Sequence, residues 1–349
     1  MSLIKLFRKK YKKVLFTTPS HYQKFFITSK FEQFYKYDIS ETDAHNPQEA
    51  LFAAEKRASE IYGTKQTLFL TNGSTSGIIA SVLTCVKKNE NVLIWDNAHR
   101  SHKNAVELAG ANPIYYSLDK NEDWGIYVDF RACELEEYLS RDKIKAVIIT
   151  SPSYEGVTCN IAAIKNICEK YNVYLIVDEA HGALYPFSDK LPQSAVNIAD
   201  FTIQSLHKTA GGLNPTALLH TNTELNVREA LAKINTTSPS YPLLMTIEKN
   251  INFLNSKKGK IKLAELINNI ERLKLNCKNV DFFNGDITKI LIKKDGISGF
   301  DLSEKLYEYG IEDEKTNEKS TMLLCGIGTN KQKLLRLEKV LRKLFTSRI

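Results

Sequence analysis

The sequence predicts an α/β fold built on a mainly parallel sheet with helices on both faces. Apolar segments alternate with helical stretches, and strands are expected near residues 66, 91, 113, 144, 173, 200 and 216. Polar side chains follow several of these segments, as Asp178 follows residues 173–177. Buried parallel strands are apolar throughout, and such sheets bind ligands at the carboxyl ends of their strands. We therefore expect seven strands and a ligand site at that edge.

Residues 1–45 are expected to form an N-terminal arm. Basic residues from Lys5 to Lys13 interleave there with apolar ones, so binding to a membrane surface or a nucleic acid is conceivable. We favour the plainer interpretation of a solvated basic helix face, because the net charge of +8 is spread through the sequence and does not indicate a nucleic-acid partner. No apolar run is long enough for a signal peptide or a transmembrane helix, which predicts a cytoplasmic protein without a membrane partner.

The first strand of the large domain, expected over residues 46–256, leads into a polar turn. Residues 72–77 read Asn-Gly-Ser-Thr-Ser-Gly and precede an apolar helix. Helix N-termini present unpaired N–H groups, and hydroxyls add donors, so this turn suits a phosphate. Ordinary helix caps would look the same. The turn lacks the lysine of a P-loop and the three glycines of a dinucleotide site, which argues against nucleotide binding.

A histidine follows the next strand. His99 comes shortly after residues 91–95, at another expected strand end. An imidazole there could stack on a flat cofactor ring or move a proton. Alternatively, it could simply hydrogen-bond its own loop.

The two segments that best indicate a chemistry stand thirty residues apart. Asp178 closes an apolar strand, and Lys208 lies between the short predicted strand at 201–205 and the glycine turn at 211–212. A lysine can form an imine with pyridoxal 5'-phosphate (PLP), and a carboxylate can keep the pyridine nitrogen of PLP protonated. Taken singly, Asp178 could cap a helix and Lys208 could be a solvated charge. Together they favour a PLP enzyme.

Beyond the large domain, residues 257–349 are expected to form a small α+β domain. The run 257–260 marks the boundary, and 261–275 is predicted as an amphipathic helix. The pattern then predicts strands over 286–293 and 322–325 and helices over 302–309 and 331–345. The six cysteines show no metal-ligand spacing, so we expect reduced thiols and no metal.

Taken together, these segments resemble the Orn/Lys/Arg decarboxylases, fold type I PLP enzymes of the aspartate aminotransferase superfamily. The resemblance covers most of residues 15–245. It is carried by residues 72–77, 97–101, 150–156, 178–182, 204–209 and 237–241.

The resemblance implies roles for individual residues. Lys208 would be the Schiff-base lysine, Asp178 the partner of the pyridine nitrogen, and His99 the ring stacked on the cofactor. Other positions implied to contact the cofactor are Ser74, Thr75, Ser76, Ala180, His181, Ser205, His207 and Ser238. Ser238 matches a segment that reaches the cofactor of a neighbouring subunit, which implies a homodimer or a higher homo-oligomer. A polar turn before a helix is the alternative for Ser238.

The resemblance also implies a reaction: decarboxylation of an amino acid, most simply a basic one such as lysine, ornithine or arginine, to an amine and carbon dioxide. An aminotransferase or another PLP lyase would need the same lysine, aspartate and phosphate turn, so both remain alternatives. We can assign no arginine to an α-carboxylate clamp, which favours decarboxylation. A non-catalytic protein that keeps only the fold is a third alternative, against which Lys208 and Asp178 argue.

The sequence departs from the family pattern at several positions, which leaves the substrate open. The departures are Leu184, Asn214-Pro215 and Pro19-Ser20-His21. Glu314 resembles a family position where an acid lies near the active site. It could contact a basic substrate, although a solvated acidic turn is the favoured interpretation.

Overall fold

The computed structural model describes residues 2–3, 5, 38–39 and 44–345. A seven-stranded sheet with the order β1-β9-β8-β7-β6-β2-β3 forms its centre. Within this sheet β9 is antiparallel to β1 and β8, and the other pairs are parallel. The strands are β1 (Gln66–Leu70), β2 (Asn91–Trp95), β3 (Asn112–Tyr116), β6 (Ile144–Thr150), β7 (Tyr174–Asp178), β8 (Phe201–Ser205) and β9 (Ala217–Thr221). The predicted α/β fold with a mainly parallel seven-stranded sheet is confirmed.

Helices cover both faces of this sheet, and successive strand residues pack on opposite faces. Leu68 and Leu70 join the core on one face, whereas Phe69 joins the core on the other. The first face is covered by α4 (Gly73–Cys85), α5 (Arg100–Leu108) and α8 (Val227–Ala232). The second is covered by α6 (Ala132–Arg141), α7 (Ile161–Lys170), α3 (Glu49–Tyr62) and α9 (Tyr241–Asn255). Burial on both faces explains why inner strands such as β6 and β7 are largely apolar.

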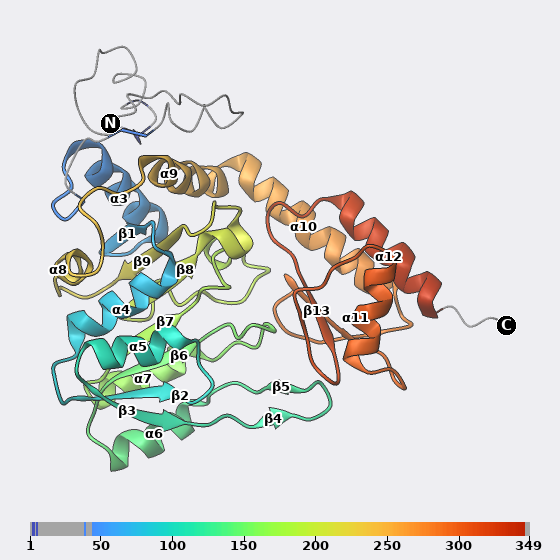
Figure 1. Ribbon diagram of the computed structural model, residues 1–349, viewed down its shortest axis with the longest axis horizontal. Helices are drawn as coiled ribbons and strands as arrows, with labels where there is room; N and C mark the ends of the chain where they lie inside the picture. The colour runs from blue at the N-terminus through green and yellow to red at the C-terminus, as the bar shows by residue number, and fades with distance from the viewer. Residues whose placement is uncertain (1, 4, 6–37, 40–43, 346–349) are drawn as a thin grey trace, which may run out of the picture.

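The C-terminal part forms a four-stranded antiparallel sheet with three helices beside the large domain (Figure 1). The strand order is β10-β11-β13-β12. The elements are α10 (Lys257–Asn276), β10 (Asp281–Phe282), β11 (Lys289–Lys293), α11 (Gly299–Glu308), β12 (Lys315–Thr316), β13 (Thr321–Leu324) and α12 (Lys331–Phe345). The predicted small α+β unit is confirmed, while the division into domains at 256 and 257 stays a prediction.

Two predicted boundaries differ from the structure. Residues 257–260 belong to the first turn of α10, because the Ser256 hydroxyl accepts a hydrogen bond from the Gly259 N–H at 3.1 Å. Gly259 also packs so closely on α9 that a Cβ atom would lie 2.0 Å from the Phe253 carbonyl oxygen. The strand predicted from residue 286 begins at Lys289, because the Asp286 carboxylate accepts the Thr288 N–H at 2.8 Å and holds a turn.

A β-hairpin reaches from the large domain to the small one (Figure 1). It consists of β4 (Lys120–Asn121) and β5 (Ile126–Tyr127), each too short to give a sequence pattern. At its tip the Trp124 ring lies 5.4 Å from the Phe283 ring. The Trp124 carbonyl also accepts a hydrogen bond from the Ser320 hydroxyl at 2.8 Å. The hairpin therefore ties the two units together.

The expected N-terminal arm, residues 1–45, lies mostly outside the described residues, as do Pro19, Ser20 and His21. In the described part, no helix is both long and apolar enough to cross a membrane. All six cysteines are unpaired.

Candidate active site

A cavity of about 620 Å³ opens at the carboxyl ends of the central strands. Its walls come from the start of α4, from the segments after β2, β6 and β7, and from the turn after β8. The β4–β5 hairpin and the small-domain residues Lys315 and Asn317 complete it. The lining includes these residues predicted for the site: Ser74, Thr75, His99, Asp178, Ala180, His181, His207 and Lys208. Their contribution to binding and catalysis stays a prediction.

Asp178 is a buried carboxylate at the end of β7. Its Oδ2 accepts a hydrogen bond from His102 Nε2 at 3.0 Å, and its Oδ1 accepts the Ala180 N–H at 3.1 Å. Burial alone would raise the pKa of Asp178, but the hydrogen bond and charge of His102 and the charge of Lys208 lower it to about 2. Asp178 is therefore ionised at neutral pH and can partner a protonated ring nitrogen.

His102 contacts the Asp178 carboxylate, and the sequence analysis did not identify it as a site residue. It is fully buried in α5, one helical turn after His99. The available signal was this spacing, because residues three apart lie on the same side of a helix. His102 fixes the orientation of the Asp178 carboxylate.

Lys208 lies in one turn of π-helix, η2 (Leu206–Ala210), directly after β8. Its Nζ lies 2.9 Å from His181 Nε2. Burial lowers the pKa of the Lys208 amine; the charge of Asp178 opposes this, and the charge of Lys289 lowers it further. Burial and the charges of Lys208 and Lys289 hold the pKa of His181 well below its usual value. A neutral imidazole therefore faces an amine that loses its proton more readily than a surface lysine.

His99 lines the cavity at the N-terminal cap of α5. Its Nδ1 lies 2.8 Å from the Ser101 hydroxyl and accepts the Ser101 N–H at 3.3 Å. Burial lowers the pKa of His99, more than the charge of Asp178 raises it. His99 thus hydrogen-bonds its own loop, which was the alternative interpretation from the sequence. Its ring also forms part of the cavity wall.

The start of α4 offers hydroxyl groups to the cavity. Ser74 and Thr75 line it, and neither hydroxyl has a hydrogen bond within the described part of the chain. Gly73 adopts a φ of +71°, which residues with a side chain rarely take. Its N–H donates a hydrogen bond to the Pro215 carbonyl at 2.8 Å. Ser76 differs, because its buried hydroxyl donates to the Gly73 carbonyl at 2.8 Å and does not line the cavity.

The remaining predicted residues lie in different surroundings. Ser205 is buried and does not line the cavity, and its hydroxyl has no partner among the described residues. His207 lines the cavity and donates from Nδ1 to the Thr216 carbonyl at 3.1 Å. Ser238 is exposed in the loop before α9 and does not line the cavity, and its hydroxyl lies 3.1 Å from that of Thr236. Its predicted reach to a neighbouring subunit stays a prediction.

Unpaired buried groups show what kind of ligand the cavity suits. The Thr150 hydroxyl and His181 Nδ1 are buried there without a partner in the described structure. Buried polar atoms without partners are costly, so they indicate a polar ligand. With the ionised Asp178, the Lys208 amine and a helix start bearing free hydroxyls, the residues fit PLP.

A buried ion pair of the small domain holds the loop that carries His181. Lys289 Nζ donates to Asp286 and to the His181 carbonyl, each at 2.7 Å, and both charged side chains are fully buried. The Tyr185 hydroxyl donates to the same Asp286 carboxylate at 2.7 Å. The position of His181 therefore depends on the small domain.

A second polar network lies behind the site. Glu179 accepts hydrogen bonds from the Ala195 N–H at 2.7 Å and from Gln204 Nε2 at 2.6 Å. Gln204 Oε1 in turn accepts from His220 Nε2 at 3.3 Å, and His220 Nδ1 accepts from the Thr67 hydroxyl at 2.8 Å. Burial raises the pKa of Glu179 to about 7 and lowers that of His220 to about 3. This network links the segment after β7 to β8, β9 and β1.

The mouth of the cavity carries paired charges. The Tyr154 hydroxyl donates to the exposed Glu314, and the Tyr154 ring lies 4.5 Å from the His181 ring. Beside it, Glu155 pairs with Lys315 at 2.6 Å. Glu314 therefore lies near the entrance without lining the cavity.

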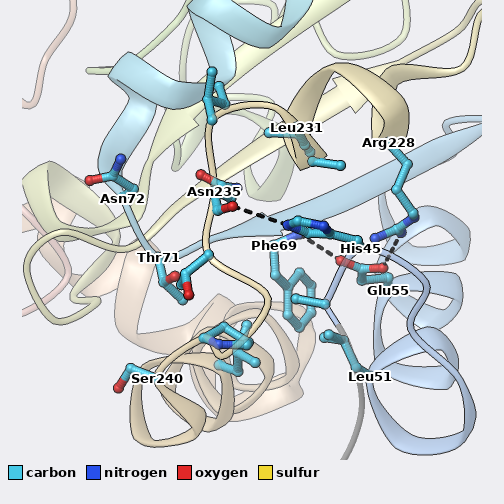
Figure 2. Close-up of a pocket in the computed structure, with 16 residues that line it drawn as sticks. His45, Leu51, Glu55, Phe69, Thr71, Asn72, Arg228, Leu231, Asn235 and Ser240 are labelled. Atoms are coloured by element: carbon cyan, nitrogen blue, oxygen red, sulfur yellow. Dashed lines mark hydrogen bonds and ion pairs between the residues drawn. The ribbon is translucent and has the colours of Figure 1, made fainter.

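A second cavity, of about 410 Å³, lies on the other side of Asn72, which lines both cavities. Figure 2 shows Glu55 paired with Arg228 in its wall, at 2.5 Å, and His45 donating to the Asn235 carbonyl at 3.0 Å. None of the residues predicted for the site lines it. We therefore place the candidate active site in the first cavity, which the predicted residues line.

Known proteins are similar to this chain over most of its length. A protein from Bacillus subtilis named Uncharacterized protein YaaO is 28% identical over 339 residues, covering 90% of this chain and 71% of that protein. An arginine decarboxylase of Halalkalibacterium halodurans is 28% identical over 325 residues, which cover 86% of this chain and 66% of that protein.

Solved structures show the same fold. The lysine decarboxylase LdcF of Francisella novicida superposes with a TM-score of 0.87 at 21% identity, covering 98% of this chain and 59% of that one. An alanine–glyoxylate aminotransferase from Nostoc sp. superposes with a TM-score of 0.68 at 13% identity. The match covers 88% of this chain and 89% of that one. The predicted fold type I is confirmed.

The chain thus spans between 59% and 71% of the length of YaaO and the two decarboxylases described. The family model for the Orn/Lys/Arg decarboxylase major domain matches residues 8–291. Because that match covers most of the sequence, the protein belongs to the Orn/Lys/Arg decarboxylase family.

Proposed function

We propose that this protein is a PLP-dependent decarboxylase of an amino acid with a basic side chain. The observation that carries the proposal is one cavity lined by the Asp178 carboxylate, the Lys208 amine and the residues Ser74 and Thr75. These groups match the three parts of PLP that a protein must hold, namely the ring nitrogen, the aldehyde and the phosphate. The family membership supports the reaction class.

Each group has a definable task. Lys208 would hold the cofactor covalently, and Ser74 and Thr75 with the N–H groups of α4 would bind its phosphate. Asp178, oriented by His102, would attract a protonated ring nitrogen through a short ionic hydrogen bond. When bound, PLP supplies an electron sink for the bond that breaks at the substrate Cα.

The Lys208 and His181 pair can hold and move a proton. The Lys208 amine lies 2.9 Å from His181 Nε2, and burial lowers the pKa of both groups. A proton can therefore pass between Nζ and Nε2, as general acid–base catalysis requires. The β4–β5 hairpin and the small domain contribute part of the cavity wall.

We also propose a homodimer or a higher homo-oligomer. Ser238 is exposed and does not line the cavity of its own chain, which suits a residue that contacts a neighbouring subunit. Light scattering of the purified protein should give at least twice the mass of one chain.

Product analysis tests the reaction. The purified protein, loaded with PLP, is incubated separately with lysine, ornithine and arginine, and products are identified by mass spectrometry. We expect the corresponding amine and carbon dioxide from at least one of them, and no product from Lys208→Ala. An oxo acid would instead indicate an aminotransferase. No turnover of any amino acid would support the non-catalytic alternative.

A further inference from the structure

Glu155 is the second carboxylate on the wall of the candidate active site. Within the described lining of the cavity, the carboxylates belong to Asp178 and Glu155. Asp178 is bonded to His102 at the end of β7, where it suits the cofactor ring. Glu155 lies at the mouth, where 11% of its side chain is exposed. A carboxylate this well buried needs a cation or several donors beside it.

The structure supplies that cation from the small domain. Lys315 Nζ lies 2.6 Å from Glu155 and 5.0 Å from the centre of the Tyr154 ring. A carboxylate beside an aromatic face is a common site for an ammonium or a guanidinium. Lys315 itself is 48% exposed, so its ammonium can turn into water at little cost.

We infer that Glu155, with the Tyr154 ring, recognises the distal cation of the substrate side chain, and that Lys315 occupies this place until a basic substrate displaces it. The inference rests on the proposed function and adds the residue that selects the side chain. Exchange of one cation for another keeps Glu155 paired throughout. A neutral side chain cannot take over this pairing, so it leaves Lys315 in place and gains nothing from Glu155.

The competing interpretation is that the lysines recognise an acidic side chain. Lys120 and Lys315 both line the cavity, and Lys120 lies 5.2 Å from the Tyr127 ring. Under that interpretation Lys315 would bind the substrate, and its removal would weaken binding. Under ours, its removal strengthens binding, so the two interpretations predict opposite effects of one substitution.

The test measures binding to the full chain loaded with PLP, through the change in the visible absorption of the cofactor. Each basic amino acid is paired with a neutral analogue of similar length: lysine with norleucine, ornithine with norvaline, and arginine with citrulline. We expect one basic amino acid to bind at least about tenfold more tightly than its analogue, since a hydrogen bond to a charged group contributes about this much. Glu155→Gln should abolish that preference while the neutral analogue binds as before.

Lys315→Met should raise the affinity for the basic amino acid several-fold and leave the neutral analogue unchanged. Lys319→Met is the matched control, because Lys319 is exposed in the same small-domain segment and does not line the cavity; it should change neither affinity. Binding of the neutral analogue also reports that each variant is folded.

Four results would overturn the inference. One is a preference for basic amino acids that survives Glu155→Gln. Another is weaker binding in Lys315→Met together with tight binding of glutamate or aspartate to the unaltered protein. The third is equal binding of the basic and neutral partners, which would leave the proposed decarboxylase standing. If no amino acid at all perturbs the cofactor, the proposed function fails and the inference fails with it.

Discussion

At the scale of single residues, the charge of Asp178 is set by groups from other parts of the chain. Burial by itself would favour the neutral carboxyl, yet His102, Lys208 and the Ala180 N–H lower its pKa to about 2. The carboxylate therefore stays ionised over the whole physiological range. A group that stays ionised in a buried site can hold a neighbouring ring nitrogen in its protonated form.

We expect Asp178→Asn to retain PLP more weakly and to lose at least about a hundredfold in kcat, because an amide cannot supply the negative charge, an effect of roughly 3 kcal/mol. Cofactor absorption after dialysis and the rate of amine formation measure the two effects. Asp96→Asn is a matched control, since Asp96 directly follows β2 but does not line the cavity. Turnover close to normal in Asp178→Asn would show that another group keeps the ring nitrogen of the cofactor protonated.

Sequence patterns locate such residues but not their partners. Asp178 closes an apolar strand, and Lys208 comes shortly after the strand at 201–205, so their common edge could be predicted from the fold. His102 lies 76 residues from Asp178, and Lys289 lies 108 residues from His181. Contacts over such separations depend on how the helices and the small domain pack, which no local pattern encodes.

At the scale of elements, strands with two buried faces were predictable and short exposed ones were not. The seven expected strands match the central sheet, and burial on both faces makes inner strands such as β6 and β7 largely apolar. The two-residue strands β4 and β5 carry no such pattern, although their hairpin lines the cavity. The π-helical turn around Lys208 was likewise not visible, because its residues are those of an ordinary turn.

The buried network across β8, β9 and β1 predicts a pH dependence of stability with two opposing parts. The pKa of His220 falls from 6.5 to about 3 on folding, so between these values the unfolded chain binds more protons and stability falls as the pH falls. The pKa of Glu179 rises from 4.5 to about 7, so over that interval the folded chain binds more protons and stability falls as the pH rises.

We expect His220→Gln to isolate the first part. The free energy of unfolding of the unaltered protein minus that of the variant should increase with pH by about 1 kcal/mol per unit from pH 3 to 6.5. The corresponding difference for Glu179→Gln should decrease from pH 4.5 to 7. Urea unfolding at several pH values gives both slopes, and differences that do not vary with pH would refute the assigned titrations.

At the scale of the whole molecule, the small domain is part of the candidate active site. Lys289 reaches the His181 carbonyl, Lys315 pairs with Glu155, and the hairpin at Trp124 is bonded to Ser320. The cavity is therefore complete only when both units are in place. This arrangement makes the geometry around Lys208 sensitive to substitutions in the small domain.

Lys289→Met should lower the free energy of unfolding by about 3 to 5 kcal/mol, because it leaves the buried Asp286 without its cation. Lys289→Met combined with Asp286→Asn should recover most of that loss, since neither charge then remains buried. If the pair had only a structural role, these substitutions would change the free energy of unfolding and nothing else. The Lys289 charge also lowers the pKa of Lys208, so in the double variant this pKa should rise.

The rate of covalent PLP capture should follow that change. Capture requires the neutral Lys208 amine, so its pH profile should move to higher pH in the double variant even though the fold is intact. Mixing experiments at a series of pH values, read by the cofactor absorption, measure the profile. A profile that coincides with that of the unaltered protein would limit Lys289 to a role in stability, whereas a shifted one identifies it as the positioning residue through which the small domain controls the active amine.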